Sequence, residues 1–162
     1  MNSKINRRYL AGLFDGEGCI FYNKIYHKDK KRDTGINIGV SISNTYKPIM
    51  EMLYNEFGGH FRERISKHQF ETGRYRKVIY ELVLRNAKAE SFIRECLPYL
   101  IIKKERAELA LELRKNTNNY QGSIVPMEEI QRRMGLIEKL SLLNKMGVSS
   151  LEFKKQLACG EC

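Results

Sequence analysis

One stretch, LAGLFDGEG at residues 10–18, constrains the fold of this chain more than any other feature. Leu10, Leu13 and Phe14 recur at the i, i+3, i+4 spacing of a single helix face, which predicts a helix with one buried side. We expect this helix to run from about Ser3, a suitable N-cap, to Phe14. Its apolar face should supply the core of the domain.

A second face of the same helix carries glycines. Gly12 and Gly16 lie four residues apart and share this face with Ile5 and Tyr9. A helical glycine costs about 1 kcal/mol relative to alanine, so Gly12 is expected to have a packing reason. A strip without side chains lets a second helix approach until the two backbones nearly touch. This face is therefore predicted to seat a partner helix.

Two acidic residues stand where this helix must end. Asp15 and Glu17 alternate with Gly16 and Gly18, which supply turn freedom. Carboxylates are unfavourable at a helix C-terminus, which carries partial negative charge and unpaired carbonyls. A hard divalent cation would relieve this, because carboxylate and carbonyl oxygens are the ligands that magnesium and calcium prefer. The alternative is a surface turn with two solvated acids.

After residue 18 the apolar period changes to that of β-strands. Ile36, Ile38, Val40 and Ile42 alternate with polar or small residues, which predicts a strand with one buried face. Strands are expected at 19–27, 36–43, 60–67 and 74–84, and helices at 48–57, 86–97 and 103–115. The order helix–strand–strand–helix–strand–strand–helix predicts an α+β fold with helices on one face of an antiparallel sheet. A further helix is expected at 126–143, and a short last one from Ser149.

The charge balance favours a nucleic-acid partner. The chain of 162 residues has 29 Lys+Arg against 19 Asp+Glu, a net charge of +10. The alternative is a merely basic protein. No apolar run approaches the ~18 residues of a membrane span, and no signal-peptide core is seen, so we expect an intracellular protein without a membrane partner, whether in the cytoplasm or an organelle. Cys19 and Cys96 are expected in the core. The Cys159–Cys162 pair is weak support for a zinc site. The alternatives are redox chemistry, cross-linking of the tail or, favoured over these, an ordinary flexible tail.

Residues 10–18 resemble the LAGLIDADG motif of homing endonucleases, with Phe14, Gly16 and Glu17 as substitutions. The resemblance covers about 1–115 and is strongest at 9–20 and around 97–107. It implies an αββαββα core forming a saddle over DNA at 1–116, followed by a C-terminal helical extension at 117–162 within the same domain. A single motif implies a homodimeric, intron-encoded endonuclease acting on a long, pseudo-palindromic double-stranded DNA target. Intron maturases that bind RNA, and non-cleaving DNA-binding proteins of this fold, are the alternatives.

The resemblance also implies roles for individual residues. Glu17 would be the direct metal ligand, joined by the Gly16 carbonyl, for Mg²⁺ with Ca²⁺ or Mn²⁺ as substitutes. Asp15 would be a supporting or structural acid. Asn44 matches an amide that positions the water network, and Lys103 matches a basic residue that steadies the scissile phosphate or the attacking water. The alternative for Lys103 is a cation on a helix surface.

Outward residues of the strands would lie in the major groove, which admits a β-ribbon. The candidates for base contact are Asn23, Asn37, Ser41, Arg62, Arg64 and Lys77. Lys28, Lys30 and Lys31, at the expected hairpin tip, would meet phosphates instead. Taken alone, any one of these side chains is more often an ordinary solvated one than a base reader.

Overall fold

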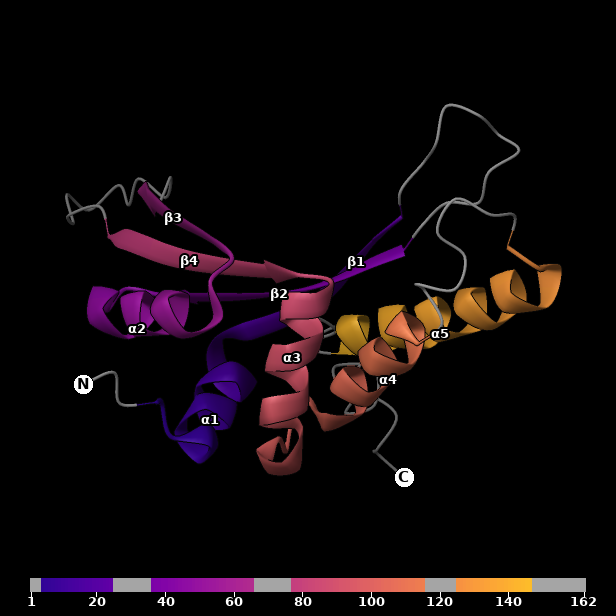
Figure 1. Ribbon diagram of the computed structural model, residues 1–162, viewed down its shortest axis with the longest axis horizontal. Helices are drawn as coiled ribbons and strands as arrows, with labels where there is room; N and C mark the ends of the chain where they lie inside the picture. The colour runs from indigo at the N-terminus through magenta and orange to yellow at the C-terminus, as the bar shows by residue number, and fades with distance from the viewer. Residues whose placement is uncertain (1–3, 25–35, 66–76, 116–124, 147–162) are drawn as a thin grey trace, which may run out of the picture.

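The structure, a computed structural model, describes residues 4–24, 36–65, 77–115 and 125–146 (Figure 1). Several sequence-based predictions fall outside these ranges and are not addressed by it. They are the N-cap at Ser3, the phosphate contacts of Lys28, Lys30 and Lys31, the Cys159–Cys162 pair, and the short helix from Ser149.

The predicted α+β fold is confirmed. The first seven elements are α1 (Arg7–Glu17), β1 (Gly18–Lys24), β2 (Ile36–Asn44), α2 (Lys47–Phe57), β3 (His60–Ile65), β4 (Val78–Arg85) and α3 (Ala87–Cys96). They are followed by the short η1 (Leu97–Tyr99), α4 (Lys104–Arg114) and α5 (Met127–Met146). The sheet order is β1-β2-β4-β3, and all three strand pairings are antiparallel.

The described helices gather on one face of the sheet and leave the other face open (Figure 1). Ile36, Ile38, Val40 and Ile42 all point to the helix side and are buried, as the strict alternation predicts. From α1 and α3, the rings of Phe14 and Phe92 meet edge to face, with centroids 5.0 Å apart. The apolar face of α1 is thus joined to the sheet through the core.

Two details at the ends of α1 differ from the sequence-based expectation. The N-cap is Asn6, whose side-chain oxygen accepts hydrogen bonds from the backbone N–H groups of Arg8 and Tyr9. At the other end the helix continues past Phe14 to Glu17, and Gly18 is extended, with φ −88°. Gly18 is therefore not needed for turn freedom. It is needed because a Cβ there would collide with the Phe14 ring and carbonyl.

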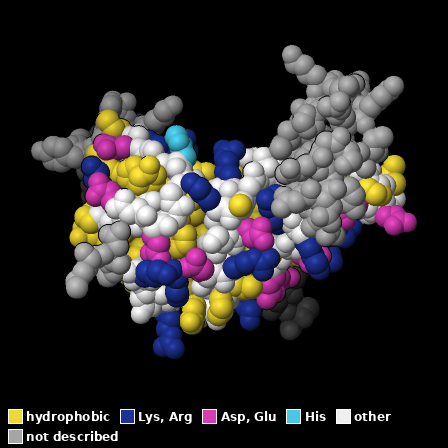
Figure 2. Space-filling model, in the orientation of Figure 1, with side chains coloured by type: hydrophobic (Ala, Val, Ile, Leu, Met, Phe, Trp, Pro, Cys, Tyr) yellow, Lys and Arg dark blue, Asp and Glu magenta, His cyan; other side chains and the backbone are white. Residues whose placement is uncertain are grey.

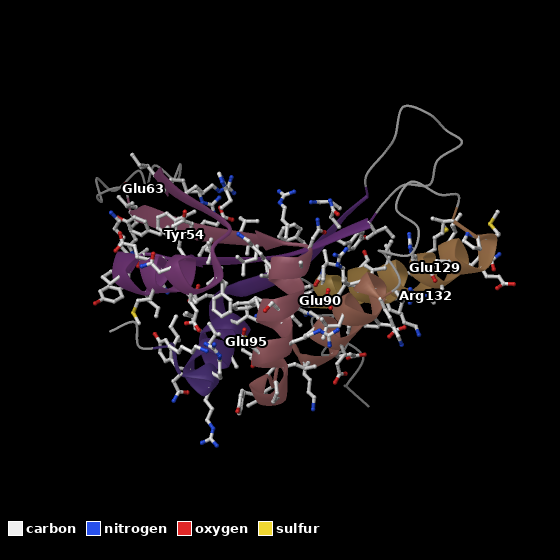
Figure 3. All side chains as sticks on the ribbon, in the orientation of Figure 1. Tyr54, Glu63, Glu90, Glu95, Glu129 and Arg132 are labelled. Atoms are coloured by element: carbon white, nitrogen blue, oxygen red, sulfur yellow. The ribbon has the colours of Figure 1, made fainter. Side chains whose placement is uncertain are left out.

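α5 is fastened to the rest of the molecule by arginines. Arg132 donates to the carbonyl oxygens of Glu112 and Lys115 at the end of α4, and it also pairs with Glu129 on α5 (Figure 3). Arg106 of α4 donates to the Leu143 carbonyl oxygen at 2.6 Å. These bonds satisfy carbonyls that a helix C-terminus otherwise leaves unpaired. Within the described ranges, no helix has the length and apolar character needed to cross a membrane.

Candidate nuclease centre and DNA-facing surface

Asp15 is buried, and its carboxylate is hydrogen-bonded to backbone groups of the same chain. Its carboxylate accepts hydrogen bonds from the backbone N–H groups of Ile101 at 2.8 Å, Ile102 at 3.3 Å and Lys103 at 2.9 Å. These groups belong to the turn that leads into α4, where unpaired N–H groups favour an anion. Asp15 therefore joins the end of α1 to the beginning of α4, which supports its expected structural role.

Lys103 lies beside this junction and is only 8% exposed. Its ammonium donates a hydrogen bond to the Asp15 carbonyl oxygen. Burial lowers the pKa of the Lys103 ammonium, while the nearby Asp15 and Glu17 carboxylates oppose this by favouring the charged form. Lys103 is thus no ordinary cation on a helix surface, because it sits buried at the acidic end of α1.

Glu17 is the acid that remains available. It is the last residue of α1 and is exposed, as is Gly16 beside it. In the described part of the chain, no cluster of three or more His, Cys, Asp and Glu side chains could by itself hold a metal ion. The Glu17 carboxylate and the Gly16 backbone carbonyl have the right oxygen chemistry for Mg²⁺ or Ca²⁺. Further ligands, such as water, would be needed to complete the coordination of such an ion.

Asn44 ends β2 and is half-buried. Its side-chain oxygen accepts a hydrogen bond of 2.8 Å from the backbone N–H of Tyr46, just before α2. The amide nitrogen and the second lone pair of the oxygen are then left to order water. By strand alternation the outward neighbour is Ser43, because Ile42 and Asn44 share the helix side. The expected role of Asn44 in the water network stays a prediction.

The predicted helix-docking strip is exposed except at one end. Gly12 and Gly16 are exposed, and a Cβ at either position would meet nothing within 4 Å inside the protomer. Tyr9, on the same face, is 55% exposed. Ile5 differs from the expectation: it lies in the protomer's own core at 6% exposure, because it precedes the helix and turns inward. The strip is therefore formed by Tyr9, Gly12 and Gly16.

Sequence reasoning missed an apolar patch near this strip. Ile101 is 86% exposed and Ile102 is 70% exposed, and their backbone N–H groups are those that hold Asp15. Nearby, Tyr99 is 43% exposed, and Arg8 of α1 lies over its ring, 6.0 Å from the centroid. Exposed branched side chains next to a bare helix face are typical of a surface that another protein covers. Their signal was present in the sequence as two adjacent isoleucines before a lysine.

The open face of the sheet carries the expected base-contact candidates. Asn23, Arg62 and Arg64 are exposed, and Asn37 and Ser41 are half-buried beside them. Lys77 is exposed and lies immediately before β4. In Figure 2, some Lys and Arg side chains stand on the upper side of the molecule, where this face lies, and others lie on the lower side over the helices. Cys19 is also exposed, contrary to the core position expected for it, because its place in the alternation of β1 points it outward.

Two further groups on this face were not foreseen. The Phe21 ring lies over Gly39 of the paired strand, where any Cβ would collide with it, and the Arg85 guanidinium stands 5.9 Å from the ring centroid. The second group is built around Glu81, which pairs with Arg62 at 2.5 Å and with Arg64 at 4.0 Å. Both depend on neighbouring strands and leave no local signature in the sequence.

A four-stranded antiparallel sheet with helices on one face is the fold of the LAGLIDADG homing endonucleases among the solved structures, and this chain has that fold. It is similar to the homing endonuclease I-CvuI in complex with its target, at 19% identity over 86% of this chain and 82% of that one, with a TM-score of 0.64. It is similar to the group I intron-encoded homing endonuclease I-CeuI complexed with DNA, at 13% identity, 86% and 68% coverage and a TM-score of 0.62.

A third similar structure is the LAGLIDADG meganuclease I-AabMI bound to uncleaved DNA. The identity is 19% and the TM-score 0.58, and the match covers 85% of this chain but 45% of that one. One I-CvuI complex with DNA was solved in the presence of calcium and another in the presence of magnesium. No protein-family profile and no curated protein sequence matches this chain.

Proposed function

We propose that this chain is a homodimeric, site-specific endonuclease that hydrolyses phosphodiester bonds of double-stranded DNA with divalent metal ions, as an intron-encoded, single-motif homing endonuclease. The observation that carries the proposal is the exposed Glu17 at the end of α1, beside an open sheet face that bears Arg62 and Arg64. One end of this surface can bind a cation and the rest can bind DNA.

The small number of acidic side chains at this centre supports the proposal that the chain assembles as a homodimer. The single chain offers one free carboxylate at α1, and magnesium needs about six oxygen ligands. The strip of Tyr9, Gly12 and Gly16, with the neighbouring Ile101 and Ile102, would let two copies of α1 pack closely and bring two Glu17 residues together. The match to less than half of I-AabMI is consistent with two such units making one enzyme.

Glu17 and the Gly16 carbonyl would hold the cation, which we propose to be Mg²⁺ with Ca²⁺ or Mn²⁺ as substitutes. Bound there, the cation supplies activation of a water and stabilisation of the leaving 3′ oxygen. Lys103 keeps a buried positive charge next to the two acids, where it would steady the scissile phosphate. Asn44 would orient water through its amide nitrogen. Asp15 fixes the end of α1 and the turn bearing Lys103 relative to each other.

The DNA would lie along the open face of two sheets related by the dimer axis. Such a surface reads a long, pseudo-palindromic target, because each copy presents the same side chains to one half-site. Asn23, Asn37, Ser41, Arg62, Arg64 and Lys77 would contact base edges, with Lys28, Lys30 and Lys31 on phosphates. Intron RNA, the alternative partner, gains no support from the structural likenesses.

A two-stage assay tests the proposal. Duplexes bound by the full chain in Ca²⁺ are selected from a randomised pool and then incubated in Mg²⁺. We expect cleavage of both strands at a common site by the wild type, binding without cleavage by Glu17→Gln, and normal cleavage by Glu138→Gln, which removes an exposed acid from α5. Selection of a site that the wild type never cuts would instead identify a non-cleaving DNA-binding protein.

A further inference from the structure

Glu81 occupies an unusual position for an acid. Its alternation on β4 places it on the open face of the sheet, yet it is only 7% exposed. In the sheet register it lies between Ser43 of β2 and Arg62 of β3. The two arginine side chains over it remain about half exposed, at 51% for Arg62 and 52% for Arg64. The arginines therefore cover Glu81 and stay accessible themselves.

The contacts explain how a carboxylate can be buried here. Arg62 donates its Nε–H to Glu81 Oε2 at 2.5 Å, and the Arg64 Nε lies 4.0 Å from the same oxygen. The hydrogen bond from Arg62 to Glu81 raises the pKa of the guanidinium, which stays charged. A buried charge that is paired and hydrogen-bonded avoids most of its desolvation cost.

An acid on a DNA-facing surface acts against affinity, because it repels phosphates and cancels a cation that could bind them. What it contributes is geometry. An unrestrained arginine reaches for phosphates, whereas one whose Nε–H is fixed presents its two terminal amino groups in a defined direction. Guanine presents two hydrogen-bond acceptors, O6 and N7, on its major-groove edge, and two amino groups held in this way can donate to both.

We propose that Glu81 is a positioning residue for sequence specificity. It holds Arg62, and more loosely Arg64, for contact with base edges, and it lowers non-specific affinity for DNA. This inference rests on the proposed function, since it concerns how the same surface discriminates between targets.

The test compares Glu81→Gln with Glu63→Gln on the full chain. Glu63 is an exposed acid on β3, and its register partner Tyr80 places it on the other face of the sheet (Figure 3). The two variants therefore lose the same charge, but only Glu81→Gln weakens the contact with the arginines, because a neutral amide oxygen accepts a weaker hydrogen bond from Arg62 than a carboxylate does. Binding is measured on a randomised duplex across a salt series, and base preference is measured by selection from the randomised pool.

For Glu81→Gln we expect non-specific affinity to rise severalfold and its salt dependence to steepen, because the released arginines reach phosphates. We expect the preference for guanine over the other bases to fall by about five- to 150-fold at the position that Arg62 contacts in each half-site. This range is the discrimination that a bidentate arginine–guanine contact provides. Arg62→Lys keeps the positive charge but lacks the planar guanidinium that donates two parallel hydrogen bonds, so it should lose the guanine preference at the same position. Glu63→Gln should leave base preference and salt slope unchanged.

Thermal melting establishes whether each variant is folded. If Glu81→Gln does not fold, the test is made with Arg62→Lys. Retained base preference in the folded Glu81→Gln or Arg62→Lys variant would overturn the inference while leaving the endonuclease proposal intact. A loss of non-specific affinity in Glu81→Gln would also overturn it. A wild type that selects no sequence at all would overturn the proposed function, and this inference with it.

Discussion

Lys103 contacts Asp15 twice: its backbone N–H donates to Asp15 Oδ1 at 2.9 Å, and its ammonium donates to the Asp15 carbonyl oxygen. The two residues are 88 positions apart in the chain. This double contact ties the last turn of α1 to the first turn of α4. The two neighbouring acids therefore have different environments: Asp15 is buried and hydrogen-bonded within the fold, whereas Glu17 is exposed at the surface.

The first prediction concerns the structural role of Asp15. In Asp15→Asn one oxygen becomes a donor that faces backbone N–H groups, so charge-assisted hydrogen bonds are lost inside the protomer. We expect the free energy of unfolding in urea to fall by about 1–3 kcal/mol. Glu17→Gln removes the same charge two residues later, from an exposed position, and should leave stability within about 0.5 kcal/mol. Equal stability of the two variants would contradict this division of roles.

The second prediction concerns assembly. Gly12→Val adds a branched side chain to the exposed strip of α1 without a clash inside the protomer, so it should weaken the dimer and leave the monomer folded. Gly135→Val is the matched control, because Gly135 is also helical and exposed with open space around it. Sedimentation of the wild type at micromolar concentration should show a dimer. A wild-type monomer that still cuts both strands would refute the shared active site.

The third prediction concerns the glycine that follows the acids. A Cβ at Gly18 would collide with the Phe14 ring and backbone carbonyl. Because Phe14 is completely buried, moving either group would disturb the packing of the core. We expect Gly18→Ala to destabilise the protein by about 1–3 kcal/mol in urea unfolding. Gly135→Ala, in open space on a helix, should be neutral or stabilising by up to about 1 kcal/mol. The opposite order would show that the α1–β1 junction is looser than the structure indicates.

The fourth prediction concerns thiol reactivity. Burial raises the pKa of the Cys96 thiol to about 12 from 9.0, whereas Cys19 is exposed on the sheet. Because the thiolate is the nucleophile, iodoacetamide at pH 8 should label Cys19 and spare Cys96 in the folded protein. The raised pKa also means that Cys96 favours folding below pH 9 and that this contribution disappears as the pH rises towards 12. Peptide mass mapping before and after unfolding checks the labelling.

Much of the architecture follows from local patterns in the sequence. The 3.6-residue period of Leu10, Leu13 and Phe14 predicts the buried side of α1, and the strict alternation from Ile36 to Ile42 predicts the inner face of β2. Periodicity carries this information because the side chains of regular elements point in directions set by the backbone geometry alone. The glycines on the second face of α1 likewise indicate an uncovered helix surface through their spacing alone.

The partners of the charged groups are decided by tertiary structure. The motif resemblance predicts different roles for Asp15 and Glu17, but their residue types and spacing do not show which groups either one contacts. The packing of the turn before α4 against α1 engages Asp15 and leaves Glu17 exposed. The pairing of Glu81 with Arg62 likewise depends on the register of β3 and β4. Periodicity assigns a residue to a face, but a hydrogen bond needs two groups within about 3 Å. That distance is set by how distant segments pack, which no local pattern in this sequence encodes.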